Sequence, residues 1–166
     1  MDSIFKNVSR IAFSIFLLSI TMFHASQALA SRDVPFKARI EGSFVFLDET
    51  SASIVGTGKS SHGGFTTLNG SVEISPTTAC ASPPGYHATQ SNEYEVANGD
   101  LIYVTVEEDA CFESEPNIAT TRGTWEITGG TGRFSDATGG GIYFGFADFN
   151  TNTGEQNLTG TISQGR

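Results

Sequence analysis

Residues 123–149 read GTWEITGGTGRFSDATGGGIYFGFADF, and this stretch decides the fold. Its first part, Gly123–Thr128, alternates between two faces, and Trp125 and Ile127 share one of them. A period of two predicts a β-strand. Gly129–Phe134 then predicts a turn, because glycine adopts a positive φ without steric cost.

The second part of the stretch, Gly141–Phe149, predicts an aromatic strand that is apolar on both faces. One face holds Ile142, Phe144 and Phe146, and the other holds Tyr143 and Phe149. Antiparallel strands of this kind suit a closed barrel, which also removes exposed sheet edges.

Strand signals recur along the rest of the chain, whereas no stretch has a convincing helical period. Further strands are predicted over Phe36–Leu47, Phe65–Ile74, Tyr86–Val96, Leu101–Glu107 and Asn157–Ser163. Irregular segments are predicted over Ser51–Gly64, Thr77–Tyr86 and Glu108–Pro116, with a hairpin turn at Asn98-Gly99. We therefore expect an all-β fold, a single antiparallel closed barrel of seven or eight strands.

The N-terminus has the three parts of a secretory signal peptide. Lys6 and Arg10 supply positive charge, Ile11–Phe23 is an apolar run, and a segment ending in small residues follows. The run is shorter than the roughly 20 residues that span a bilayer, so we expect no stable membrane anchor after cleavage. We expect 1–30 to be removed and 31–166 to form one secreted or periplasmic β-barrel domain.

Composition limits the partners and the chemistry of the chain. Its net charge of −9 repels phosphate backbones, which makes nucleic acid a poor partner. Cys80 and Cys111 are the only cysteines, and in an oxidising compartment we expect them to form a disulfide. A metal or redox pair is the alternative, but no CxxC spacing supports it, and His62 and His87 alone do not make a zinc site. We expect no metal and no cofactor.

The segment Trp125–Gly139 resembles the signature of the allene oxide cyclase and dirigent families, and Leu158–Thr161 resembles the final strand of the cyclases. Val34–Ser75 looks more like small secreted bacterial members of this calycin-type barrel superfamily. The resemblance implies an eight-stranded barrel with a central cavity, and it allows homo-oligomers. It carries over no catalytic residue. The matching positions form a structural turn, in which Phe134 would plug the barrel: Gly129, Gly130, Gly132 and Phe134.

If the barrel is hollow, aromatic residues of its strands are the candidate ligand contacts. These are Phe44, Phe46, Tyr103, Trp125, Tyr143, Phe144 and Phe146. Two glutamates are candidates for a catalytic carboxylate: Glu107, which shares a face with Tyr103, and Glu126, which shares a face with Thr124. A glutamate inside the cavity would have a raised pKa and would exchange protons readily. The alternative is that these acidic residues lie on a solvated surface.

The sequence leaves three functions open. The first, which it favours, is a module that binds a small apolar or amphipathic ligand in the barrel. The second is an enzyme of the cyclase or isomerase type, or one with dirigent-like stereocontrol, that uses a cavity carboxylate. The third is a structural or interaction protein with a filled barrel. A large void with a carboxylate at its floor would favour the enzyme. A void without ionisable groups would favour the binding module, and a filled interior would favour the structural or interaction protein.

Overall fold

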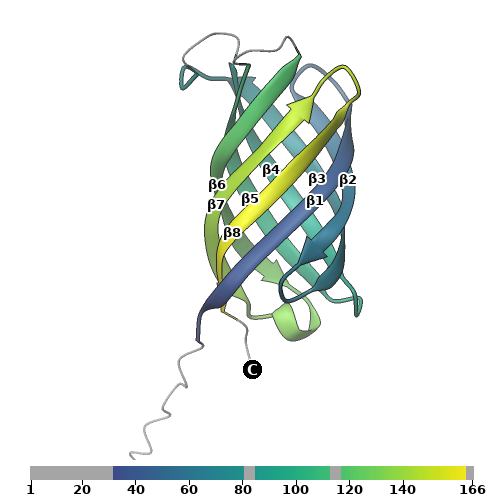
Figure 1. Ribbon diagram of the computed structural model, residues 1–166, viewed down its shortest axis with the longest axis vertical. Helices are drawn as coiled ribbons and strands as arrows, with labels where there is room; N and C mark the ends of the chain where they lie inside the picture. The colour runs from purple at the N-terminus through teal and green to yellow at the C-terminus, as the bar shows by residue number, and fades with distance from the viewer. Residues whose placement is uncertain (1–31, 81–84, 113–116, 164–166) are drawn as a thin grey trace, which may run out of the picture. The chain divides into compact units, whose positions relative to one another are not determined.

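The computed structural model describes residues 32–80, 85–112 and 117–163, so the expected signal peptide lies outside the described residues. The described residues form one closed antiparallel barrel in which each strand pairs with its sequence neighbours and the last pairs with the first (Figure 1). The strands are β1 (Val34–Phe46), β2 (Ser51–Ser60), β3 (Gly64–Pro76), β4 (Gly85–Val96), β5 (Leu101–Cys111), β6 (Ile118–Gly130), β7 (Thr138–Asp148) and β8 (Thr153–Ser163). The predicted all-β, eight-stranded closed barrel is confirmed.

The loop predicted over Ser51–Gly64 is wrong, because most of it is strand β2. Ala52 and Ile54 face the barrel interior and supply the apolar positions of this strand. Gly58 lies against the backbone of β1, where a Cβ atom would collide with the carbonyl oxygen of Arg39. The glycines that made the segment resemble a loop therefore permit close approach of two strands.

The start of the loop predicted over Glu108–Pro116 is also wrong, because residues 108–111 belong to strand β5. Strand β5 continues to Cys111, which pairs with Gly85 of β4. Residues 113–116 lie outside the described part of the chain. The extension matters because it places Glu108 inside the barrel, where it is buried.

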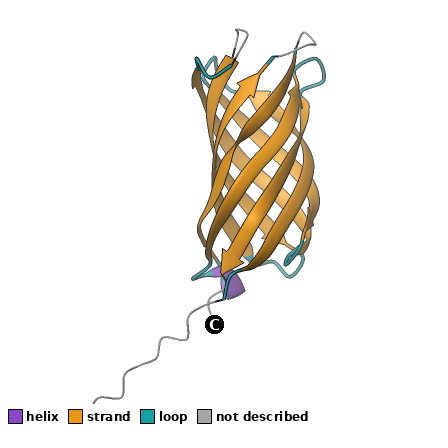
Figure 2. Cartoon of the chain, turned by 60° about the vertical axis from the view of Figure 1, so that its left-hand side comes forward, coloured by secondary structure: helices purple, strands orange, loops and turns teal. Residues whose placement is uncertain are grey.

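The lower end of the barrel is filled and plugged. The 3₁₀ turn η1 (Gly132–Phe134) lies at this end (Figure 2) and buries Phe134 completely. Gly132 has φ +54°, a conformation that favours glycine. Arg133 Nε lies 3.6 Å from a carboxylate oxygen of Asp100. Among the described residues η1 is the only helical element, and no helix is long and apolar enough to cross a membrane.

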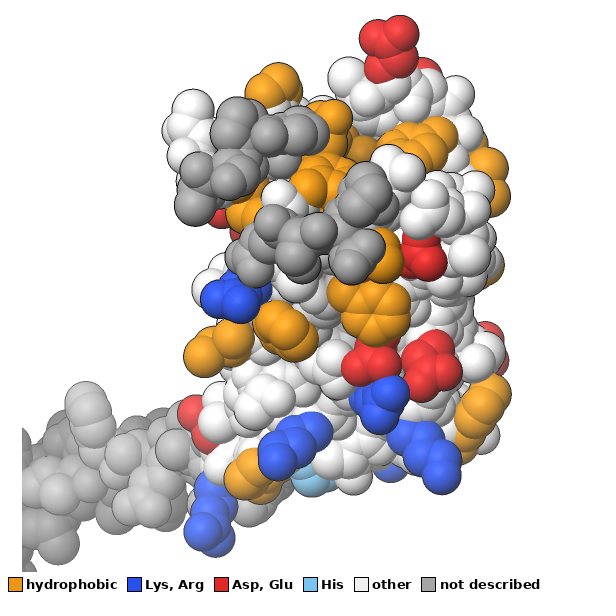
Figure 3. Space-filling model, turned by 45° about the horizontal axis from the view of Figure 1, so that its top comes forward, with side chains coloured by type: hydrophobic (Ala, Val, Ile, Leu, Met, Phe, Trp, Pro, Cys, Tyr) orange, Lys and Arg blue, Asp and Glu red, His pale blue; other side chains and the backbone are white. Residues whose placement is uncertain are grey.

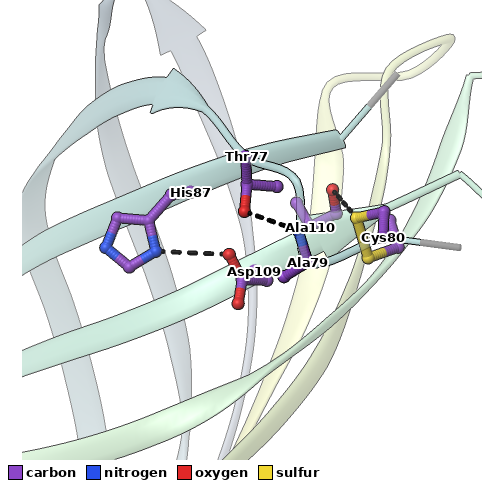
Figure 4. Close-up of a disulfide and its surroundings, with 7 residues drawn as sticks. Thr77, Ala79, Cys80, His87, Asp109 and Ala110 are labelled. Carbon is purple, nitrogen blue, oxygen red and sulfur yellow. Dashed lines mark hydrogen bonds and ion pairs between the residues drawn. A yellow bond between two sulfur atoms is a disulfide. The ribbon is translucent and has the colours of Figure 1, made fainter. Parts of the chain in front are cut away.

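The predicted disulfide between Cys80 and Cys111 is present, with 5.5 Å between the two Cα atoms. It joins the segment after β3 to the end of β5 (Figure 4). This end of β5 is the one farther from η1, because the start of β5 pairs with the residues just before η1. The Cys80 sulfur also lies 3.5 Å from the carbonyl oxygen of Ala110, the residue before its partner. The disulfide therefore links two chain segments at the end of the barrel farther from η1.

Candidate ligand-binding cavity

The upper half of the barrel is hollow, with a cavity volume of about 590 Å³. The cavity exists because small residues occupy inward positions of these strand halves, whereas large side chains fill the lower half. The small inward residues along the cavity are Gly42, Ala52, Ala88, Ala110 and Gly154. The lower half is instead packed with side chains that include Phe36, Val96, Ile102, Ile127, Phe134 and Ile162.

Aromatic side chains surround the mouth of the cavity. Phe44 and Phe149 pack with ring centroids 5.3 Å apart, and Phe112 packs against Phe149 at the same distance. Phe46 and Tyr86 extend this cluster, and both are more than a third exposed. Figure 3 shows hydrophobic side chains gathered at this end of the barrel. Exposed aromatic rings around an opening are typical of an entrance for apolar molecules.

Polar side chains form a connected network at the cavity floor. Tyr94 donates its hydroxyl to the amide oxygen of Gln156 at 3.0 Å. The Gln156 amide nitrogen donates to Gln90 Oε1 at 2.9 Å, and Asn92 Nδ2 donates to the same oxygen at 2.9 Å. Both lone-pair directions of that oxygen are thereby used, and the Gln90 amide nitrogen is turned toward Glu108.

Glu108 is the ionisable group of this floor, and it is only 6% exposed. Gln90 Nε2 donates to Glu108 Oε1 at 2.5 Å and to the Tyr143 hydroxyl oxygen at 3.3 Å. Burial raises the pKa of the Glu108 carboxyl, and the hydrogen bond from Gln90, together with the nearby hydroxyl groups of Thr121 and Tyr143, lowers it only in part. Within the described residues, Glu108 Oε2 and Thr121 Oγ1 have no partner in hydrogen-bond geometry. A carboxyl whose ionisation burial disfavours therefore lies beside the cavity, and one of its oxygens has no partner among the described residues.

Four of the seven predicted ligand contacts line the cavity: Phe44, Phe46, Tyr143 and Phe146. The other three lie elsewhere. Trp125 belongs to the filled part of the core, where its ring centroid is 5.2 Å from that of Phe36. Tyr103 is on the outward-facing side of β5, and Phe144 is 46% exposed with Arg122 over its ring.

Neither predicted carboxylate faces the cavity. Glu126 is exposed on the outer face of β6. Glu107 is exposed on the outer face of β5, where it accepts hydrogen bonds from Thr89 at 2.9 Å and His87 at 3.0 Å. Successive strand residues point to opposite faces, so the inward position belongs to the next residue, Glu108.

Two carboxylates on the outer face of β5, those of Asp109 and Glu107, raise the pKa of His87. His87 Nδ1 lies 3.3 Å from Asp109 (Figure 4), and His87 Nε2 lies 3.0 Å from Glu107. Hydrogen bonding to Asp109, followed by that to Glu107, raises the pKa of the imidazole. This cluster lies outside the barrel and is separate from the cavity floor.

Sequence reasoning missed the polar floor, in particular Gln90, Glu108 and Thr121. One signal was present. Ile102, Val104 and Val106 form the more apolar face of their strand, and Glu108 continues that face. Comparisons of the chain with protein-family models, with curated proteins and with solved structures find no match.

Proposed function

We propose that this chain is a binding protein whose barrel holds a small, mostly apolar molecule, with the polar part of that molecule at the floor. The observation that supports the proposal is the cavity of about 590 Å³, with apolar walls and a floor that includes Gln90, Glu108 and Tyr143. Cavities of roughly 300–1,000 Å³ with apolar walls and a few polar groups are typical of small-molecule sites.

The disulfide is compatible with an oxidising compartment. Export, directed by the segment that resembles a signal peptide, is part of the proposal. A secreted or periplasmic barrel of this kind would carry or sequester an apolar compound outside the cytoplasm. The cyclase-like and dirigent-like turn motif agrees with such a barrel, and kinship with those families is likewise proposed.

A titration with Nile red, a neutral apolar dye whose fluorescence increases in apolar surroundings, tests the binding function. The variant Ala88→Phe places a ring in the cavity and is expected to abolish the fluorescence increase. Ser91→Phe adds the same ring on the exposed outer face of the same strand and is the matched control. Saturable binding by the wild type and the control, but not by Ala88→Phe, supports the proposal. Equal fluorescence from all three proteins would contradict it.

Glu108 places a carboxyl at the floor of the void, which is the condition that favours an enzyme of the cyclase or isomerase type or one with dirigent-like stereocontrol. Catalysis is the second candidate, because either function requires first that the cavity bind a small molecule. A buried carboxyl with a raised pKa is suited to general acid–base catalysis at neutral pH. The test incubates an apolar extract of the source culture with the wild type, Glu108→Gln and Glu107→Gln, and compares the products by mass spectrometry. A product that forms with the wild type and Glu107→Gln, but not with Glu108→Gln, supports catalysis. An extract unchanged by all three proteins counts against it.

A further inference from the structure

The residues that line the cavity include acidic side chains but no basic ones among the described residues. The acidic ones are Glu49, Glu108 and Glu155, and Lys, Arg and His are all absent from the lining within the described part of the chain. Glu49 is exposed, and the carboxylate of Glu155 is held by Arg39. Glu108 therefore supplies the buried carboxyl. Arg39 approaches Glu155 to 2.6 Å, but its side chain is 63% exposed and does not line the cavity. A ligand carboxylate or phosphate at the floor would therefore be a buried anion without a counter-ion, which is costly.

The hydrogen-bond network determines which polar groups remain for a ligand. Gln90 is saturated, because its oxygen accepts from Asn92 and Gln156 while its nitrogen donates to Glu108 and Tyr143. Since Glu108 Oε1 accepts from Gln90, a proton on this carboxyl belongs on Oε2, the oxygen without a partner among the described residues. Asn92 Oδ1 is also buried without a partner among the described residues, but it lies against Gly70 and Asn92 does not line the cavity. The remaining capacity of the cavity-lining floor residues thus includes hydroxyl hydrogens.

Three hydroxyl groups contribute to this capacity. They are the acid O–H of Glu108, the hydroxyl of Thr121, and the hydroxyl of Tyr143, whose oxygen already accepts from Gln90. Their natural partner is an oxygen that accepts hydrogen bonds. An ammonium group has only donors to offer, and pairing with it would require ionisation of the Glu108 carboxyl, which burial disfavours.

We propose that the cavity selects neutral, oxygen-bearing amphiphiles, such as long-chain ketones and alcohols, and rejects carboxylates and ammonium ions of the same length. The ligand oxygen accepts hydrogen bonds from the hydroxyl groups of Glu108 and Thr121. Glu108 and Thr121 line the cavity while Oε2 and Oγ1 are buried, so the proposal includes a side-chain rotation of either residue toward the ligand. This selectivity rests on the proposed binding function.

Displacement of Nile red by four ligands of matched length tests the selectivity: dodecanol, methyl decyl ketone, dodecanoate and dodecylammonium. At about pH 7 we expect the alcohol and the ketone to bind at least tenfold more tightly than the two ions, which corresponds to about 1.4 kcal/mol or more. Dodecanoate or dodecylammonium binding as tightly as the alcohol would overturn the selectivity and leave the binding function standing. Failure of Nile red and all four ligands to bind would overturn both.

A matched pair of variants tests the role of the hydroxyl groups. Thr121→Val removes an unpartnered inward hydroxyl with little change of shape, and Thr124→Val makes the same change on the exposed face of β6. We expect ketone affinity to fall about fivefold in Thr121→Val, the usual value of one hydrogen bond, and to stay unchanged in Thr124→Val. Glu108→Gln keeps a neutral donor and should bind the ketone within about threefold of the wild type. Unchanged ketone affinity in Thr121→Val, or its loss in Glu108→Gln with Nile red still bound, would overturn the proposal.

Discussion

Replacing Glu108 by Gln should stabilise the barrel, and increasingly so as the pH rises. The carboxyl is 6% exposed, and it accepts a hydrogen bond from Gln90 that a Gln side chain of nearly equal size also accepts. The main difference between the two side chains is that Gln does not ionise. The unfolded wild type gains free energy when this carboxyl ionises in water, whereas the folded wild type keeps it protonated.

The magnitude follows from proton linkage. Burial raises the folded-state pKa of Glu108, whereas the unfolded chain titrates near about 4.3. Below that pH both states are protonated, and Glu108 contributes no pH-dependent penalty. Above it the unfolded state binds fewer protons than the folded state, so the wild type loses up to about 1.4 kcal/mol of stability per pH unit. The loss stops growing once the pH passes the folded-state pKa.

Urea unfolding of the wild type and Glu108→Gln, from about pH 5 to about pH 7, measures this difference. The other titrating groups are common to both proteins, so they largely cancel in the comparison. Glu126→Gln is the control, because this carboxyl is exposed on the outer face of β6 and is not a partner of His87, so it should give no comparable slope. A stability difference for Glu108→Gln that stays constant with pH, or that shrinks as pH rises, would refute the assignment of a buried neutral acid.

Three further predictions concern the frame around the cavity. The double variant Cys80→Ser/Cys111→Ser should lose about 3–4 kcal/mol in urea unfolding, since the disulfide closes a long loop, and a loss near zero would show the bond to be energetically unimportant. Phe134→Ala should lose about 3–5 kcal/mol in the same assay because Phe134 is fully buried, and a change under about 1 kcal/mol would contradict its role as a plug. His87→Ala should lower the melting temperature at mildly acidic pH and have no effect at alkaline pH. The stabilisation comes from a pKa raised chiefly by Asp109, so it is present below about pH 6.5 and is lost as pH rises through the folded-state value; a pH-independent effect would contradict it.

Much of the barrel can be predicted from the sequence because local signals determine it. The Asn98-Gly99 dipeptide marks a turn, and Gly99 indeed has φ +84°. The glycine-rich run after Ile127 ends its strand and begins the plug. By contrast, strand β2 was mistaken for a loop, because its glycines allow close packing against β1 and that packing is visible only when the partner strand is known.

The inward face of each strand is harder to predict. On β7, Ile142 is 69% exposed, whereas Gly141 and Gly145 are on the inward side with Tyr143. The rule that large apolar residues face inward fails at the two glycine positions because a Cβ atom would collide with a backbone carbonyl oxygen of β8, that of Thr159 or Glu155. The same difficulty applies to β5, whose inward face the sequence does not identify. Glu107 and Glu108 point to opposite faces, so the choice of face decides which of the two carboxyl groups lies at the cavity floor.

Native mass spectrometry of the protein purified from its own host tests the central claim, that the barrel holds a small apolar ligand, most directly. The account predicts a population heavier than the polypeptide by the mass of a small neutral molecule, which is released on denaturation and identified in the organic extract. Ala88→Phe, which fills the cavity, should lack that population, while Ser91→Phe should retain it. A wild-type spectrum with the mass of the polypeptide alone, together with no binding of Nile red, would contradict the claim.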